Sequence, residues 1–430
     1  MKIKRLANTC TISRMRNGFI RARIIATLKS TKSRLCLCRC LWISLAALSA
    51  AACSSSHPPM PGPPCNTVSS ENTPVQTSNH APSPAPDTPL TTTMEPPQKT
   101  SPAIVLDNLE TWFEDVRHAT DTDMLENAFR RQNYDPGPDA YALIANIESD
   151  HNGQTAYQFY SYRDSAFIFS LTPDGQENFW PASTVKLTAA VMALLRAESL
   201  GIHADDPMTF TDLGDEHHTT LRKLVNDAII PSDNQAYNAL MLFTGLDRAN
   251  DTYIRDMFRF PTMVLQRRYY RKTPADNLRH SPIFIFEHAD KIITVPEEVS
   301  SHYFEHVPRE ANATTLVELA EMIRRVMTRQ WLPLNEAHFQ ILQNALLKAP
   351  SCIADGVHKA HPDYKIYNKG GRVIGDDRLE IAYITDNAGH PKYLLALSLP
   401  YSETVETRTQ EFAWQLIQAV DENHLQADFH

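Results

Sequence analysis

The chain has 430 residues, with 41 Lys and Arg against 50 Asp and Glu and a formal net charge of −9. Its basic residues concentrate at the start, because residues 1–40 carry eleven Lys or Arg and the first acidic residue is Glu71. Beyond residue 104 there are 29 basic and 47 acidic residues, so the charge argues against a nucleic-acid partner.

The first 53 residues have the pattern of an export signal. A basic region precedes the apolar, small-residue run 41–52, which is too short to be a permanent membrane span. The run ends in Ala50-Ala51-Ala52-Cys53, which resembles a bacterial lipoprotein signal with a lipidated cysteine. We therefore expect a periplasmic protein of the cell envelope, anchored through Cys53 with the outer membrane favoured; plain signal cleavage is the alternative, and Met15 is an alternative start.

Residues 54–103 have the composition of a disordered tether. They are rich in Ser, Thr and Pro, and 13 of the 29 prolines fall between residues 54 and 102. Of the seven cysteines only Cys352 lies beyond the tether, so the sequence predicts no disulfide framework.

The folded domain is predicted to span residues 104–430. A helical pattern runs from residue 104 to about 131, and helices are also predicted after Pro181 and over 220–229, 235–243 and 405–420. Strand patterns cover 141–147, 157–162, 166–171, 378–385 and 392–399. Strands at both ends enclose a helical middle, which predicts a mixed α/β fold: an antiparallel sheet flanked by helices, with an inserted helical lobe and a cleft at their junction.

The first candidate chemical motif is Ser183-Thr184-Val185-Lys186, at the start of a long apolar run. Positions i and i+3 share one face of a helix, so the Ser183 hydroxyl and the Lys186 amine face the same way. A desolvated lysine loses its proton more easily and can activate a serine nucleophile. The motif alone is short enough to occur by chance, so further motifs are needed.

Two further motifs follow in a fixed order. Ser232-Asp233-Asn234 lies 49 residues after Ser183, and Lys369-Gly370-Gly371 lies 137 residues after Ser232. Together the three motifs resemble the signatures of the penicillin-recognising serine enzymes, the group of serine β-lactamases and penicillin-binding proteins. Residues 221–240 and 312–322 sharpen the resemblance to class A β-lactamases, which implies a five-stranded antiparallel sheet beside an all-helical lobe.

The resemblance also implies roles for these residues. Ser183 attacks an amide or lactam carbonyl, Lys186 takes its proton, and the backbone N–H groups of Ser183 and Arg372 hold the oxyanion. Ser232 passes a proton to the leaving nitrogen, Lys369 attracts the substrate carboxylate, and Asn234 and Gly371 help to seat the substrate.

The third motif departs from the family pattern, since the family usually has Thr or Ser where this chain has Gly370. We expect Arg372 to compensate through a bidentate contact to the substrate carboxylate. Unchanged acylation by penicillins in an Arg372→Ala variant would refute that expectation.

In class A enzymes, a glutamate within an E-x-x-L-N pattern activates the water for deacylation. This sequence contains no such pattern. The corresponding region, residues 246–311, is longer than expected and carries Arg267, Arg268 and Tyr269 where acids are expected. Counting back from Asn312 makes Glu297 and Glu298 the candidate bases, with exposed loop glutamates as the plain alternative. Without a base the acyl-enzyme should persist.

The sequence leaves three functions open. The first is β-lactam hydrolysis through an acyl-serine, the second a D,D-peptidase or other amidase or esterase of the cell wall, and the third a catalytically silent ligand-binding module of the envelope. We expect a monomer with a small β-lactam or cell-wall peptide as substrate, no cofactor and no metal, because the pairs His302/His306 and His358/His361 have no third ligand in the sequence.

Overall fold

The computed structural model describes residues 102–149, 154–163, 166–170, 179–269, 277–301, 307, 311–372, 377–400 and 402–427. All of them belong to one compact unit, Thr67–His430. The predicted signal, the lipidation site Cys53 and the tether before residue 102 lie outside the described residues, as do His302 and His306. Within the described part of the chain, no helix has the length and apolar character needed to cross a membrane.

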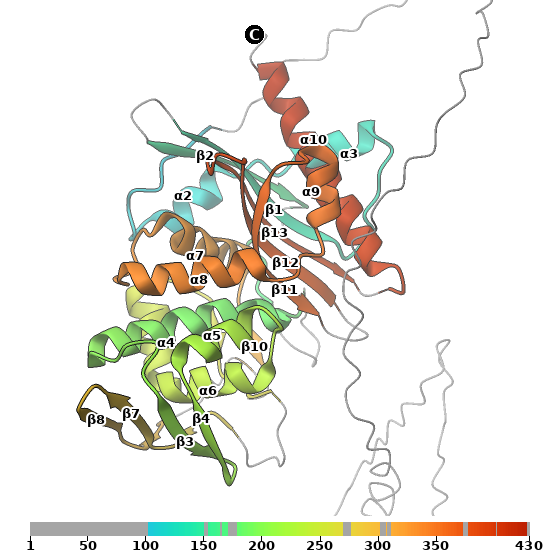
Figure 1. Ribbon diagram of the computed structural model, residues 1–430. Helices are drawn as coiled ribbons and strands as arrows, with labels where there is room; N and C mark the ends of the chain where they lie inside the picture. The colour runs from blue at the N-terminus through green and yellow to red at the C-terminus, as the bar shows by residue number, and fades with distance from the viewer. Residues whose placement is uncertain are drawn as a thin grey trace, which may run out of the picture. The chain divides into compact units, whose positions relative to one another are not determined.

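A five-stranded antiparallel sheet forms the centre of the fold (Figure 1). In spatial order its strands are β11 (Lys365–Arg372), β12 (Asp377–Thr385), β13 (Pro391–Pro400), β1 (Tyr141–Ser149) and β2 (Thr155–Tyr162). The N-terminal strands pair directly with the C-terminal ones, since Leu143 lies opposite Ala396. The predicted sheet built from both ends of the domain is therefore confirmed.

Side chains alternate between the two faces of this sheet, as the period of a strand requires. Leu143, Leu379 and Ile381 pack into one hydrophobic core, while Ile144 and Ile384 pack into a second core. In Figure 1 the second face is covered by α3 (Met124–Arg131), α9 (Ala354–Ala360) and α10 (Val405–Ala427). The first face is covered by α2 (Trp112–Ala119), α7 (Leu316–Thr328) and α8 (Glu336–Lys348).

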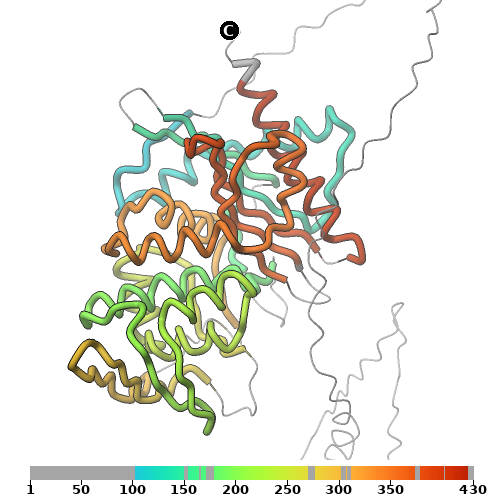
Figure 2. The backbone as a smooth tube through the Cα atoms, viewed as in Figure 1, coloured from blue at the N-terminus to red at the C-terminus, as the bar shows by residue number. Residues whose placement is uncertain are grey.

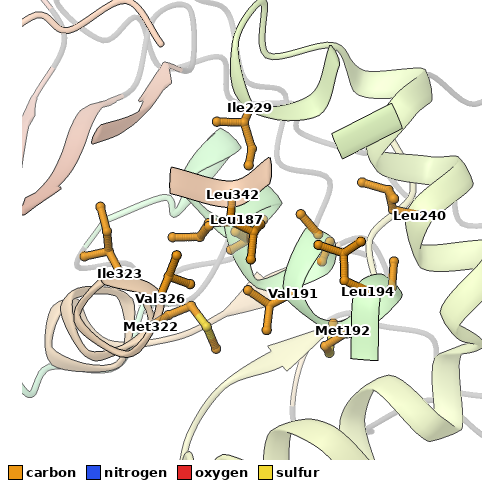
Figure 3. Close-up of a cluster of buried hydrophobic side chains, with 14 of the residues drawn as sticks. Leu187, Val191, Met192, Leu194, Ile229, Leu240, Met322, Ile323, Val326 and Leu342 are labelled. Carbon is orange, nitrogen blue, oxygen red and sulfur yellow. The ribbon is translucent and has the colours of Figure 1, made fainter. Parts of the chain in front are cut away.

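Helix α4 (Lys186–Leu200) is the centre of the helical lobe. Every residue from Lys186 to Ala197 is buried, which suits a helix that is apolar all round. Figure 3 shows Leu187, Val191 and Leu194 of α4 surrounded by side chains of α5 (Leu221–Ile229), α6 (Asn234–Thr244), α7 and α8. Helix α4 is thereby enclosed by other helices of the domain.

A second, four-stranded sheet joins the lobe to the long insertion. It contains β3 (Met208–Asp212), β4 (Asp215–Thr219), β7 (Phe284–His288) and β8 (Lys291–Val295), in the order β4-β3-β7-β8. The tube in Figure 2 follows the same chain, with the green and yellow segments forming the lobe. The remaining elements are η2 (Arg248–Met257) and two short ribbons, which pair β5 (Val264–Leu265) with β10 (Asn312–Ala313) and β6 (His280–Ser281) with β9 (Glu298–Val299).

Two sequence predictions about elements were wrong. The helix predicted over 104–131 is divided into α2 and α3, because Asp121 bridges Tyr160 of the sheet between them. The described residues 166–170 of the strand predicted over 166–171 lie outside every strand. They contact the segment before α7 instead, where the Ser170 amide donates to the Thr314 carbonyl at 2.8 Å.

Candidate active site

The candidate nucleophile lies at the junction of the sheet and the lobe. A short 3-10 turn, η1 (Ala182–Val185), carries the half-buried Ser183 and leads directly into α4. Ala182 has a left-handed backbone with φ 46°, a conformation that costs energy for a residue other than glycine. The Tyr269 hydroxyl donates a hydrogen bond to the Ala182 carbonyl at 2.7 Å, which holds this strained turn in place.

Lys186 is buried in the first turn of α4 and points to the Ser-Asp-Asn loop. Its Nζ is 2.6 Å from Asn234 Oδ1 and 3.3 Å from Ser232 Oγ, and it also donates to the Ser232 carbonyl. Burial, aided by the positive charge of Lys369, lowers the pKa of Lys186 to about 6, although Asp233 opposes the shift. At neutral pH the amine therefore carries a free lone pair and can accept a proton.

Ser232 lies between two lysines. The loop between α5 and α6 places it in a left-handed conformation with φ 59°, while Asp233 caps α6 by accepting from the Ala236 amide at 2.7 Å. Its Oγ is 3.3 Å from Lys186 Nζ and 2.9 Å from Lys369 Nζ. This hydroxyl is the link through which a proton can pass between the lysines and a bound substrate.

Lys369 reaches the site from the edge strand β11. Its side chain is buried, and Nζ donates to Ser232 Oγ at 2.9 Å and to the Gly370 carbonyl at 2.6 Å. Burial lowers the pKa of Lys369 to about 7; Glu380 opposes the shift and Arg378 adds to it. Two lysines with lowered pKa values thus share one serine hydroxyl.

Gly371 lets β11 approach the nucleophile. A β-carbon at this position would lie 3.1 Å from Ala182 Cβ, 3.1 Å from the Ser183 backbone N and 3.3 Å from the Pro181 carbonyl oxygen. Any side chain here would push the strand away from Ser183. The next residue, Arg372, directs Nη1 to 3.6 Å from Glu406 Oε1 of α10, and its predicted contact with a substrate carboxylate stays a prediction.

A buried carboxylate explains the departure at Gly370. Glu380 lies opposite Gly370 on β12, and a β-carbon on Gly370 would be 2.9 Å and 3.0 Å from its two carboxylate oxygens. Glu380 is fully buried and accepts from the Cys352 amide at 2.8 Å and from Arg378 Nη2 at 3.1 Å. The hydroxyl residue that the family has at this position would collide with a carboxylate that is held from two sides.

Tyr269 forms the wall next to Lys186. The ring centroid is 5.7 Å from Lys186 Nζ, and burial raises the pKa of the phenol to about 12, so the group is neutral. Asn238 fixes the Tyr269 backbone from both sides, with distances of 2.6 Å and 2.9 Å. Arg267 then lies over Trp180, 4.4 Å from the ring centroid. Phenol and guanidinium therefore stand in the region where the class A resemblance led us to expect an acid.

The structure contradicts Glu298 as a deacylation base. Its Oε1 pairs with Arg196 Nη2 at 2.7 Å and with Arg248 Nη2 at 2.9 Å. Arg196 lies ten residues after Lys186 on α4, about 15 Å along the helix, and its Nη1 donates to the Thr244 carbonyl at the far end of α6. Glu298 is thus at the opposite end of both helices from Lys186.

The neighbouring Glu297 is exposed, and the structure gives it no contact with Ser183 or Lys186. In the described part of the chain, no carboxylate bonds to the Lys186 amine or to the Ser183 hydroxyl. Counting back from Asn312 failed because sequence distance does not give position within a long segment that has its own fold. The insertion instead forms paired strands, which carry these glutamates away from the site.

Sequence reasoning also missed two residues of the site. The sequence places Tyr269 where an acid is expected but assigns it no role, although that position in the loop is a usable signal. Glu380 lies in a strand that was predicted correctly, but only the register with β11 shows that it lies behind Gly370. By contrast, the three motifs correctly predicted which polar side chains lie together. These are Lys186, Ser232, Asn234 and Lys369.

The antiparallel sheet beside a helical lobe, with three motifs meeting at their junction, defines the class of penicillin-recognising serine enzymes. A family model described as the Beta-lactamase enzyme family matches residues 140–411. Because this match spans more than half of the chain, the protein belongs to the Beta-lactamase enzyme family.

Several solved structures are similar to this chain. A β-lactamase from Burkholderia vietnamiensis is 15% identical, with 70% of this chain and 96% of that chain covered and a TM-score of 0.45. A class A β-lactamase from Bacteroides cellulosilyticus is 12% identical, with 70% and 98% covered and a TM-score of 0.47. The last common ancestor of Gram-negative class A β-lactamases is 17% identical, with 70% and 100% covered and a TM-score of 0.46. Among curated protein sequences, none matches this chain.

Proposed function

We propose that this protein is a serine enzyme that β-lactams acylate at Ser183, with Lys186 as the base. The observation that carries the proposal is the placement of Lys186. Its amine is buried, contacts Ser232 and Asn234 and lies on the same helical face as Ser183, three residues earlier, and burial lowers its pKa to about 6. A buried lysine with a lowered pKa can accept the proton of a serine on the same helical face, which is what a serine nucleophile needs.

The acylation step then follows from the contacts. Ser183 Oγ attacks the carbonyl carbon of the lactam while its proton moves to Lys186 Nζ, and the carbon–nitrogen bond of the lactam breaks. Ser232, whose Oγ is 3.3 Å from Lys186 Nζ, passes a proton to the leaving nitrogen. The backbone N–H groups of Ser183 and Arg372 hold the oxyanion, and Gly371 permits the close approach of the strand that this requires.

We also propose that the acyl-enzyme is long-lived. Hydrolysis of an acyl-serine needs a base that activates water. Among the described residues, the phenol of Tyr269 lies beside Lys186 and is neutral, while Asp233, whose charge also acts on Lys186, is engaged in capping α6. The same observation favours a second function, a D,D-peptidase or related amidase of the cell wall, for which slow release of penicillin is natural. The export signal and Cys53 support a place for either enzyme in the cell envelope.

The test is a time course of the full chain with benzylpenicillin, followed by intact-protein mass spectrometry. We expect a mass increase equal to one penicillin that persists while little penicilloate forms. An adduct that clears while penicilloate accumulates would make the protein an efficient β-lactamase and refute the long-lived intermediate. The absence of any adduct would refute the proposed acylation altogether.

A further inference from the structure

We propose that His203, Asp206 and His288 form a binding site for zinc or a similar first-row divalent ion. One ligand atom from each of these residues lies within 4.8 Å of the other two, and in the described part of the chain they are the one such group of three. Two imidazoles and one carboxylate are a ligand set that zinc uses in proteins, with bonds of about 2.0–2.2 Å. This inference does not depend on the proposed catalytic function.

The backbone holds two of the ligands opposite each other. β3 and β7 pair with Met208 opposite Phe286, so continuing this register places Asp206 opposite His288. The Glu287 amide donates to the Pro207 carbonyl at 2.9 Å, which extends the pairing up to the site. As a result His288 Nδ1 is 3.0 Å from both carboxylate oxygens of Asp206.

The third ligand is placed by a tight turn after α4. Gly201 ends the helix in a left-handed conformation, and the His203 amide then donates to Asp206 Oδ2 at 2.8 Å while the Asp206 amide donates to the His203 carbonyl at 3.1 Å. The His203 ring lies edge-on to the His288 ring, with 4.4 Å between centroids. Donor atoms bound to one zinc ion lie about 3.2–3.5 Å apart, so small side-chain rotations bring all three onto one ion.

Burial and charge distinguish this group from an ordinary histidine–aspartate pair. Asp206 is buried, His288 is half-buried and His203 is exposed, which leaves an entry path for an ion on the side of His203. The charge of the neighbouring Asp205 is already balanced by Arg222, whose Nη2 lies 2.7 Å from Asp205 Oδ2. Among the residues that the structure describes, by contrast, the pairs His390–Asp386 and His361–Asp421 are not joined by a third residue into such a group.

The position of the site indicates a structural role. It lies at the end of α4 opposite Lys186, about 20 Å away by the rise of the helix. Its ligands come from the lobe and from β7, which belongs to the insertion whose role the sequence left open. A bound ion would fasten the insertion to the lobe.

The test is titration of the chelator-treated full chain with zinc chloride in a calorimeter, together with thermal unfolding in the presence and absence of zinc. We expect saturable zinc binding and a rise in Tm with zinc concentration, and we expect His288→Ala and His203→Ala each to remove one binding equivalent and the rise in Tm. His390→Ala is the matched control, because it removes an exposed histidine paired with one aspartate at the same distance of 3.0 Å. It should bind zinc as the unaltered chain does.

Two results would overturn the proposal. One is the absence of saturable zinc binding by the unaltered chain. The other is equal binding by His203→Ala and His390→Ala, which would show that zinc binds only to scattered surface groups. His203 is exposed, so its substitution should leave folding intact and keeps the test decisive if His288→Ala fails to fold.

Discussion

Substituting Gly370 tests whether the buried Glu380 carboxylate is the reason that the third motif has a glycine at this position. The added β-carbon of Gly370→Ala would lie 2.9 Å, 3.0 Å and 3.2 Å from Glu380 Oε2, Oε1 and Cδ. Glu380 cannot swing away cheaply, because the Cys352 amide and Arg378 hold it within a fully buried position. Overpacking of this kind costs about 1–3 kcal/mol, so we expect Gly370→Ala to lower the free energy of unfolding by that amount.

The sign of this effect is informative, because glycine is a poor strand residue. Gly370 does not have a left-handed φ, and in a strand alanine is normally more stable than glycine by about 0.5–1 kcal/mol. We therefore expect Gly370→Ala to become neutral or stabilising once the carboxylate is gone. The double variant Arg378→Met/Glu380→Ala supplies that background, since it removes both charges of the buried pair and leaves neither unpaired.

The assay is urea unfolding of four proteins: the unaltered chain, Gly370→Ala, the double variant and the triple variant. A steric collision between the added β-carbon of Gly370→Ala and the Glu380 carboxylate predicts a coupling free energy of about 1.5–4 kcal/mol between this substitution and the removal of the Arg378–Glu380 pair. An equal cost of Gly370→Ala in both backgrounds would refute the reasoning.

Three further predictions concern the site. Acylation by penicillin should have a bell-shaped pH profile: Lys186 becomes a free base above a pKa of about 6, and Lys369 loses the charge that attracts a substrate carboxylate above a pKa of about 7. Stopped-flow rates that are flat from pH 5 to 9 would contradict this. Tyr269→Phe removes the hydrogen bond to the carbonyl of the strained residue Ala182. We therefore expect a loss of about 1 kcal/mol in the free energy of unfolding, together with slower acylation. Unchanged acylation would show that Tyr269 does not position the turn that carries Ser183. Glu298→Gln should cost about 1–3 kcal/mol by breaking its pairing with Arg196 and Arg248 but leave the adduct lifetime unchanged; a longer lifetime would restore Glu298 as the base.

The strands and the three motifs could be predicted because their signals are local. Alternating apolar residues identified β1, β2, β12 and β13, and the i, i+3 spacing of Ser183 and Lys186 placed both at the start of a buried helix. The order of the motifs then indicated the family. Local patterns failed where a segment depends on distant contacts: residues 166–170 alternate like a strand but bond to the loop before α7.

The rest of the site depends on contacts that spacing does not determine. Glu380 matters because the register places it behind Gly370, and Tyr269 matters because Asn238, 31 residues earlier, fixes its backbone. The error with Glu298 has the same origin. Its place was estimated by counting through an insertion whose strands fold away from the site.

The most direct test of the central claim is to find where benzylpenicillin attaches. The labelled full chain is digested and the modified peptide is sequenced by mass spectrometry, alongside Ser183→Ala and the control Ser199→Ala, which removes a serine at the other end of α4. We predict that the label lies on Ser183, that Ser183→Ala takes up none and that Ser199→Ala is labelled normally. A label on another residue, or equal labelling of Ser183→Ala, would contradict the assignment of Ser183 as the nucleophile.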